Sequence, residues 1–174
     1  MQVPVSPTDK NGWAPLHSAA NEGRLDICEI LLEHGAFAPA RTMEGTSALH
    51  YLARVNIGLR RDAFRRVVDR MLQGGAELNG ESKMCVLQLF GSFLVRLAVS
   101  GQNRHGLTPL HEAALRGNFL VVQVLLEFED LAIDATTAQG ETALIYAARG
   151  NFANILNLLL DHGANPNNIG SEGE

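Results

Sequence analysis

Histidine is the residue type in this sequence best suited to chemistry, because imidazole binds metal ions and exchanges protons near neutral pH. The chain contains six, namely His17, His34, His50, His105, His111 and His162. None of them stands at the spacing of a metal site from another ligand residue. The sequence therefore predicts no metal site, no catalytic histidine and no cofactor.

Motifs for other kinds of catalysis are also missing from the sequence. It contains no Gly-x-Ser-x-Gly turn, no glycine-rich phosphate loop, no His-Glu-x-x-His and no Cys-x-x-Cys. Cys28 and Cys85 stand among apolar residues, where packing explains a thiol better than catalysis does. Carboxylates such as Glu112 and Glu141 fall in different repeating segments, and solvated surfaces explain them better than paired acid and base roles. We expect a protein that is not an enzyme.

Composition and charge narrow the class of partner. The 174 residues are 46% apolar, which suffices for a continuous core, and they carry a net charge of −5. An acidic chain has no general attraction to a phosphate backbone, so a nucleic acid partner is not expected. Two cysteines and a beginning without a secretory signal favour a reducing compartment, the cytoplasm or alternatively the nucleus.

Four segments share one pattern, in which a glycine precedes a short stretch typical of a helix start. They read Asn11-Gly12-Trp13-Ala14-Pro15-Leu16-His17, Glu44-Gly45-Thr46-Ser47-Ala48-Leu49-His50, His105-Gly106-Leu107-Thr108-Pro109-Leu110-His111 and Gln139-Gly140-Glu141-Thr142-Ala143-Leu144-Ile145. Their glycines are 33, 61 and 34 residues apart. Two of these intervals match a known solenoid period of roughly 33 residues, and the middle one is too long.

Each segment begins a short first helix. The expected N-caps, whose hydroxyl oxygen accepts from a free backbone N–H, are Ser47, Thr108 and Thr142. Pro15 and Pro109 follow at the first helical position. Ala14 replaces the hydroxyl in the first segment, so that helix is expected to fray, at a cost of about 1 kcal/mol.

A turn and a second helix follow each first helix. The turns are expected at Gly23, Gly117 and Asn151, because Asn enters the left-handed region more easily than other non-glycine residues. The second helices repeat one apolar face, formed by Ile27, Leu31 and Leu32, by Val121, Leu125 and Leu126, and by Ile155, Leu159 and Leu160. Glycines that end these helices are expected at Gly35, Gly75 and Gly163.

At these residues the sequence resembles the ankyrin repeat family, whose Thr-Pro-Leu-His signature is complete at Thr108 to His111. The resemblance implies an all-α solenoid of stacked helix-turn-helix units with hairpin tips, in repeats of about 9–41, 42–79, 103–136 and 137–168. It also implies that His17, His50 and His111 link the backbones of adjacent repeats. Ile145 replaces the signature histidine in the fourth repeat, and Glu129 replaces the helix-ending glycine in the third.

The long interval indicates two insertions, one within the second repeat and one between the second and third repeats. Seven extra residues fall near 55–62, after which Phe64, Val67, Val68, Met71 and Leu72 restore an apolar helical face. Twenty-one extra, strongly apolar residues fall at about 84–104, too few and too interrupted for a membrane span of roughly 20 apolar residues. They are expected either as a helix packed on the stack, covering it or forming a groove for a partner, or as an alternative exon.

The two ends of the chain are expected to lie outside the stack. Residues 1–8 are predicted to be a flexible N-terminus. Gly173 and Glu174 repeat the start of a unit, which predicts that 169–174 begin a truncated fifth repeat. An uncapped C-terminal repeat would allow weak self-association.

In ankyrin-like stacks the turn tips and the exposed side of the first helices bind partners, so this resemblance nominates contact residues by position. At the tips they are Lys10, Asn11, Trp13, Met43, Glu44, Arg104, His105, Leu107, Ala138, Gln139 and Glu141. On the first helices they are Ser18, Asn21, Glu22, Tyr51, Arg54, Glu112, Leu115, Arg116, Tyr146 and Arg149. Trp13 is the preferred candidate, because exposed Trp dominates interface energetics. Its alternative role is to shield the N-terminal end of the stack.

The second repeat is locally basic within an acidic protein. Its six arginines are Arg54, Arg60, Arg61, Arg65, Arg66 and Arg70. An acidic or phosphorylated partner could bind them. The alternative is a solvated outer face whose ion pairs contribute little to stability.

Three functions remain open from the sequence. The first is a scaffold or adaptor that binds another protein through the concave face and the tips. The second is a targeting or regulatory segment of a larger enzyme whose catalytic part lies outside this chain. The third is a substrate of an asparaginyl hydroxylase at Asn79 or Asn167, because hairpins of this kind resemble targets of such enzymes.

Overall fold

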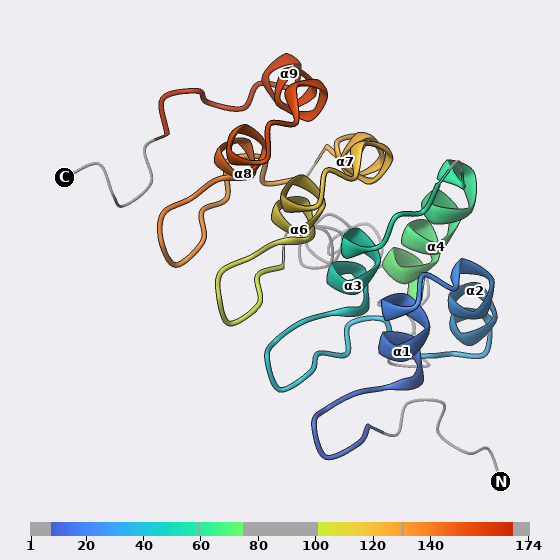
Figure 1. The fold of residues 1–174 in the computed structure, drawn as a ribbon. Coiled ribbons are helices and arrows are strands. Elements are labelled where there is room, and N and C mark those ends of the chain that lie inside the picture. Colours follow the sequence, from blue (N-terminus) through green and yellow to red (C-terminus); the bar gives the residue numbers. More distant parts are fainter. Residues whose placement is uncertain (1–7, 59, 75–100, 130, 169–174) are drawn as a thin grey trace, which may run out of the picture.

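The computed structural model describes residues 8–58, 60–74, 101–129 and 131–168, in which the helices form two layers (Figure 1). The first layer contains α1 (Pro15–Asn21), α3 (Ala48–Arg54), α6 (Pro109–Leu115) and α8 (Ala143–Arg149). The second layer contains α2 (Leu25–Glu33), α4 (Arg61–Gly74), α7 (Phe119–Leu125) and α9 (Ala153–Asp161). Neighbouring helices pack against one another within each layer, and the layers are joined by the pairs α1 with α2, α6 with α7 and α8 with α9. The predicted all-α repeat solenoid is confirmed.

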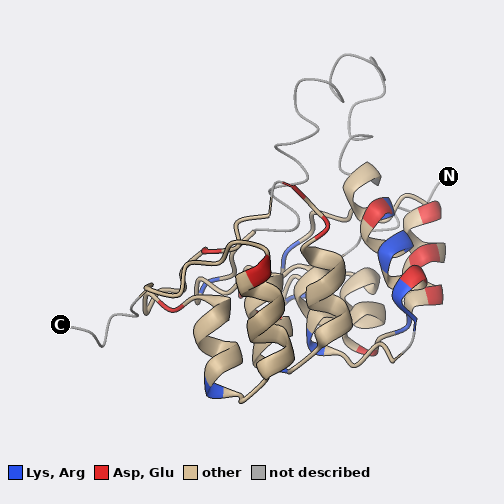
Figure 2. Cartoon of the chain, turned by 90° about the horizontal axis from the view of Figure 1, so that it is seen from above, with Lys and Arg blue, Asp and Glu red and all other residues tan. Residues whose placement is uncertain are grey.

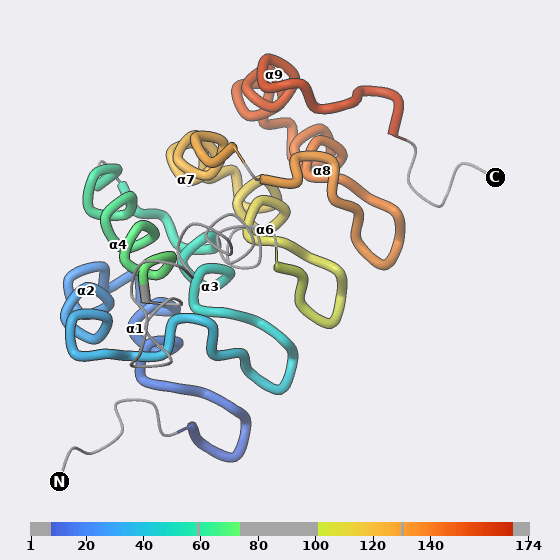
Figure 3. Tube along the Cα trace, turned by 180° about the vertical axis from the view of Figure 1, so that it is seen from behind, coloured from blue at the N-terminus to red at the C-terminus, as the bar shows by residue number. Residues whose placement is uncertain are grey.

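The tips extend from the first-helix layer, on the side away from the second layer (Figure 3). We define the four tips as residues 9–13, 42–46, 103–107 and 137–141. Across the described ranges the only β-type pairing is an isolated antiparallel bridge between Arg41 and Ser47, at the base of the second tip. The first helices therefore carry the tips, and the second helices form the outer layer.

The first helices start where the sequence predicts, with extended residues at Ala14, Ser47, Thr108 and Thr142. The Thr108 hydroxyl accepts from the His111 N–H, as predicted. Thr142 is the N-cap of α8 as predicted, but the expected bond is missing, because its buried hydroxyl has no hydrogen-bond partner in the described part of the chain. The helix α1 is as long as α6 although Ala14 has no hydroxyl, so the expected fraying is not seen. The His17 ring accepts the Ala14 N–H at 3.0 Å, as the His111 ring does for Thr108.

The predicted turns are confirmed, as are two of the three predicted glycine caps, while Gly75 lies outside the described residues. Gly23, Gly117 and Asn151 have φ of 65°, 70° and 56°, and Asn151 is the only non-glycine residue with positive φ in the described ranges. Gly35 and Gly163 are also left-handed, directly after α2 and α9. The helix α7 has seven residues where α2 and α9 have nine, so the third repeat lacks the normal end of its second helix.

The core follows the periodicity of the sequence with one exception. Leu16, Leu49, Leu110 and Leu144 all belong to one buried cluster. In the second repeat Phe64, Val67, Val68 and Met71 are buried, which confirms the face predicted after the first insertion. The exception is in α2, where Ile27 was expected to be buried with its equivalents and is 42% exposed.

The predicted insertion, at about 84–104, overlaps the third tip at residues 103 and 104. In this tip the Asn103 side chain accepts from the His105 and Leu107 N–H groups. Residues 84–100 of the insertion lie outside the described residues, as do Gly75, Asn79, Cys85, most of the predicted N-terminal segment and residues 169–174. The expectations that depend on those residues stay predictions.

Gly106 should be the glycine least tolerant of alanine. Its φ is 75°, and an added Cβ would lie 2.6 Å from the backbone nitrogen of Ala138 in the next tip. At Gly35, φ is 81° but an added Cβ would contact nothing within 4 Å. Gly35→Ala should cost about 1–2 kcal/mol for the left-handed backbone. Gly106→Ala should cost clearly more, because the neighbouring backbone must also shift. Urea denaturation of both variants tests this, and equal losses would contradict it.

Candidate functional site

Each tip is held by a side chain three residues before its glycine. The Asp9 carboxylate accepts from the Asn11 and Trp13 N–H groups, both at 2.8 Å. Asn103 and Thr137 make the equivalent bonds in the third and fourth tips, and Thr42 bonds the Thr46 N–H in the second. The sequence analysis missed these residues. Their signal was present, because Asp, Asn and Thr are the residues that hold such turns and they recur with the period of the glycines.

The tips are also bonded to one another in a continuous ladder. The Met43 N–H donates to the Asn11 carbonyl at 2.9 Å, and the Arg104 N–H donates to the Glu44 carbonyl at 2.9 Å. In the same way the Ala138 N–H donates to the His105 carbonyl at 3.2 Å. The backbone of each tip is thus fixed by its neighbour, while the side chains of Asn11, Met43 and His105 stay exposed.

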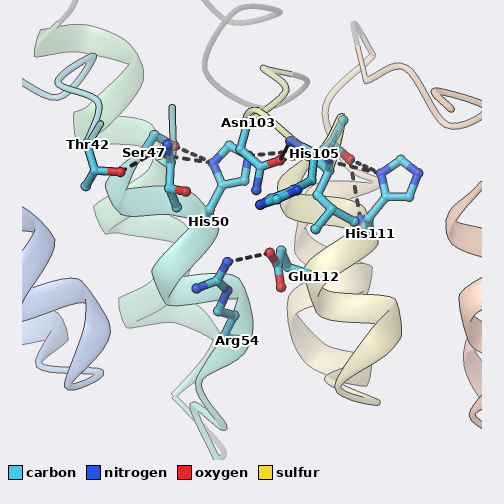
Figure 4. A network of polar contacts seen from close by, with 11 residues as sticks. Thr42, Ser47, His50, Arg54, Asn103, His105, His111 and Glu112 are labelled. Atoms are coloured by element: carbon cyan, nitrogen blue, oxygen red, sulfur yellow. Dashed lines mark hydrogen bonds and ion pairs between the residues drawn. The ribbon is translucent and has the colours of Figure 1, made fainter. Parts of the chain in front are cut away.

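The three signature histidines are buried, and Figure 4 shows two of them, His50 and His111. In each, Nδ1 faces the backbone N–H three residues before it, and Nε2 faces a backbone carbonyl farther along the chain. The Nε2 to oxygen distances are 3.0 Å from His17 to Ala40, 2.9 Å from His50 to Leu107 and 3.1 Å from His111 to Glu141. Since Nδ1 must accept, the ring proton is on Nε2. The predicted link to the next repeat is confirmed for His50 and His111, whereas the carbonyl that His17 bonds belongs to the end of its own repeat.

These contacts require neutral imidazoles. A second proton on Nδ1 would point at a backbone N–H that is already a donor. Burial, which penalises the charged form, lowers the pKa of His17 and His111, and lowers that of His50 to about 4. The three rings are therefore structural groups at neutral pH.

We call the exposed side of the first helices, which includes Asn21, Arg54, Leu115 and Arg149, the inner face. Aromatic contacts connect the first two repeats there. The Trp13 ring lies 4.9 Å from the Tyr51 ring between centroids, and Tyr51 in turn contacts His17 edge-on at 6.1 Å. The Arg54 guanidinium lies 5.1 Å from the centre of the Tyr51 ring. Trp13 is half-buried against the core. Its truncation is now expected to lower stability as well, which makes it a poor test of binding.

Arg54 also makes the best-buried ion pair of the described residues. Its Nη2 donates to Glu112 Oε1 at 2.6 Å, linking α3 to α6 (Figure 4). The exposed fractions of the two side chains are 32% and 3%. The carboxylate hydrogen bond raises the pKa of Arg54. Glu112 thus neutralises a charge within the protein.

The fourth repeat contains a similar pair that is less buried. Arg149 forms an ion pair with Glu141 at the fourth tip. The Tyr146 ring packs edge-on against His111, and burial together with the Glu141 contact raises the pKa of its hydroxyl. These contacts hold the inner face of the last repeat in place.

The predicted contact residues differ in how accessible they are. The exposed ones are Lys10, Asn11, Ser18, Asn21, Glu22, Met43, Glu44, Arg104, His105, Leu115, Arg116, Ala138, Gln139 and Arg149. The half-buried ones are Trp13, Arg54, Leu107, Glu141 and Tyr146. Tyr51 and Glu112 are buried, so their nomination as partner contacts needs correction: each packs or pairs with neighbouring repeats.

The charges of the outer layer gather on α2 and α4, whereas α7 carries none and α9 only Asp161 (Figure 2). Arg66 and Arg70 pair with Glu29 of α2, and Arg70 also pairs with Glu33. On the other side of α4, Arg61 and Arg65 both pair with Glu127, beyond α7. The Arg65 guanidinium also lies over the Phe128 ring, 4.5 Å from the ring centre. Four of the six arginines considered for an acidic partner are thus neutralised by neighbouring repeats, and Arg54 is paired on the inner face.

The described ranges show no metal site, no reactive cysteine and no membrane-spanning helix. They contain no group of three His, Cys, Asp or Glu side chains placed to hold a metal ion. Burial raises the pKa of the Cys28 thiol to about 12, so this cysteine stays protonated and unreactive. A helix with the length and apolarity for a membrane crossing is also missing from this part of the chain.

Sequence comparisons agree with this architecture. A family model described as ankyrin repeats (3 copies) matches residues 2–82 and 76–169. Rabankyrin-5 of Homo sapiens is 26% identical over 150 residues, which cover 83% of this chain and 11% of that protein. The human transient receptor potential cation channel subfamily A member 1 is 28% identical over 160 residues, 90% of this chain and 12% of that protein. Human SH3 and multiple ankyrin repeat domains protein 2 is 28% identical over 114 residues, 63% of this chain and 6% of that protein. The chain therefore spans a small part of the length of each of these relatives.

Proposed function

Because this chain belongs to the ankyrin repeat family, whose members are generally protein interaction modules, we propose that it is a scaffold or adaptor that binds a partner protein. The binding surface would comprise the tips and the inner face. Its cysteine usage suits the cytoplasm or the nucleus.

The observation that carries this proposal is the accessibility of one row on the inner face. Equivalent positions of the four first helices hold Asn21, Arg54, Leu115 and Arg149. Both arginines are paired to glutamates of the protein, which fixes their positions. Leu115 stands between them in this row. Its side chain is 42% exposed and does not belong to the core cluster. An apolar side chain framed by fixed polar groups is typical of an interface centre.

Leu115→Gln should weaken partner binding at least tenfold without a change in folding. A lost apolar anchor of this kind costs about 1.4 kcal/mol or more, which is a factor of ten in affinity. Because Leu115 is exposed and Gln favours helices, the free energy of unfolding should change by less than about 0.5 kcal/mol. The measurements are quantitative capture of proteins on the immobilised chain, titration of the strongest one, and urea denaturation.

Ile30→Gln is the matched control, because Ile30 is 50% exposed on the outer layer. It should leave capture unchanged. If Leu115→Gln and Ile30→Gln lose the same proteins, or neither loses any, the inner face is not the binding surface.

The second candidate is a targeting or regulatory segment of a larger enzyme. It is favoured by the small share of each relative that this chain spans, 11% and 12% for the first two named above. The same inner face would then bind either a separate protein or another domain. The open reading frame around this segment distinguishes the two.

A further inference from the structure

The first helices of the second, third and fourth repeats present arginine as their only exposed charge. Within α3, α6 and α8 the sole acid is Glu112, whose side chain is 3% exposed. The Arg54 and Arg149 side chains are 32% and 54% exposed, and Arg116, directly after α6, is exposed as well. This part of the inner face is therefore cationic, although the whole chain carries a net charge of −5.

The two paired arginines of this face keep hydrogen-bond donors for a ligand. One nitrogen of Arg54, Nη2, bonds Glu112, and one nitrogen of Arg149, Nη1, pairs with Glu141. A guanidinium has five N–H donors, so others remain. In both pairs the carboxylate is the more buried member, with exposed fractions of 3% and 13%, and the guanidinium lies on the solvent side. Each pair thus turns its positive end outward and is held in place by its own carboxylate.

Arg54, Leu115 and Arg149 hold equivalent positions in three adjacent helices, since α3 packs against α6 and α6 against α8 (Figure 1). Packed helices are about 8–10 Å apart, so an arginine position lies at roughly that distance on either side of Leu115. A polyproline II segment rises about 3.1 Å per residue with three residues per turn. Every third side chain therefore points the same way, at intervals of about 9 Å. The two spacings match.

We propose that the partner contributes an extended segment in which an apolar side chain has a carboxylate three residues before it and another three residues after it. This inference rests on the function proposed above and specifies the chemistry of the partner. The apolar side chain packs on Leu115, and the two carboxylates accept hydrogen bonds from Arg54 and Arg149. Arg116, next to Leu115 in the chain, adds a third positive charge near the centre.

An acidic peptide segment fits this row better than a nucleic acid does. The central position is apolar, and both arginines beside it already bond a carboxylate of the protein. Nucleic acids gain affinity by placing a phosphate against each of many cations, and here Arg116 alone forms no ion pair with the described residues. The exposed acids Glu22 and Glu44, after α1 and in the second tip, would repel further phosphates.

Random peptides displayed on phage and selected on the immobilised 174-residue chain test the proposal. The enriched peptides should share an apolar residue with Asp or Glu three residues before and three residues after it, and Leu115→Gln should lower their enrichment at least tenfold. Enriched peptides without acids at this spacing would overturn the proposal, as would a selection that enriches none. A fluorescent single-stranded RNA that binds more tightly than the best peptide would also overturn it.

Fluorescence anisotropy with the most enriched peptide tests the arginine contact directly. Arg149→Gln should weaken binding at least tenfold, because it removes a charge-assisted hydrogen bond. The Arg149 pair is half-exposed, so the variant should stay folded, which circular dichroism checks. The matched control is Arg24→Gln, which removes an exposed arginine at the turn before α2 and should leave the affinity unchanged.

A double-mutant cycle identifies the acid that Arg149 binds. Each acid of the peptide is replaced by glutamine in turn, and binding to the parent chain and to Arg149→Gln is measured. For one of the two acids the losses should not add, because either change breaks the same contact. Additive losses for both acids would overturn the proposal, as would an equal loss in the Arg24→Gln control.

The failure of this inference can be told apart from the failure of the proposed function. If Leu115→Gln removes captured proteins and selected peptides alike, but the peptides lack the paired acids, the inner face binds partners and only the partner chemistry is wrong. If Leu115→Gln leaves both unchanged, the inner face is not the binding surface and both proposals fail.

Discussion

Lowering the pH from 7.5 to 4.5 should reduce the free energy of unfolding by about 2–3 kcal/mol through His50 alone. Its pKa is about 4 in the folded protein, against roughly 6.5 in an unfolded chain. The unfolded state therefore binds more protons at all pH values below about 6.5. The stabilising effect of the neutral ring is complete above pH 6.5 and is lost progressively as the pH falls toward 4. His17 and His111, whose pKa values are also lowered by burial, act in the same direction.

Urea denaturation at a series of pH values measures this loss. His50→Gln removes the titrating ring, so its stability should be lower at pH 7.5 but should fall less on acidification than that of the parent chain. His105→Gln is the control, since it makes the same substitution at an exposed tip residue. Acidification also protonates carboxylates in ion pairs, and the difference between the two variants separates that effect from the effect of His50. Parallel profiles for all three proteins would contradict the assignment.

Arg54→Met should cost about 3 kcal/mol, the second large effect. The substitution leaves the Glu112 carboxylate, which is 3% exposed, without its only cationic partner in the described part of the chain. Removing one member of a buried pair typically costs about 3–5 kcal/mol, because the other charge stays buried and uncompensated. We expect the lower end of this range, because the Arg54 side chain is 32% exposed and the pair therefore retains some contact with water.

The double variant Arg54→Met, Glu112→Leu decides between pairing and packing as the cause. Replacing both charges by apolar groups is often close to neutral, so most of the lost stability should return. A double-mutant cycle by urea denaturation gives the coupling energy. Two additive losses would mean that the contact of the Arg54 guanidinium with the Tyr51 ring matters and the charge pair does not.

Local signals in the sequence were sufficient to predict the helices and turns within each repeat. Each glycine, proline and apolar residue that predicted an element acts within about ten residues, so its effect can be read from one segment. Asn151 is the clearest case, because a single residue type at the expected position indicated a left-handed turn, which is present. The same reasoning correctly raised doubt about the end of α7.

Contacts between repeats could not be read in this way. Glu112 looked like an exposed acid of α6, and only the packing of α3 beside it provides Arg54. The arginines of α4 formed a basic cluster in the sequence, while their partners Glu29 and Glu127 lie one repeat away on either side. Ile27 matched the apolar period, but burial requires a neighbour on its side of the stack.

The joint between the second and third repeats is made by residues on either side of the long interval. The Asn118 side chain donates to the Ala53 carbonyl at 2.7 Å, and Arg41 Nη1 donates to the Gln102 carbonyl at 3.0 Å. With the His50 and Arg54 bonds, these contacts hold α3 against α6. Closing a chain segment between two fixed ends costs entropy that grows only with the logarithm of its length, about 0.6 kcal/mol for each doubling. Segments of very different length could therefore be accommodated at this joint during evolution or by design, with the register of the stack preserved.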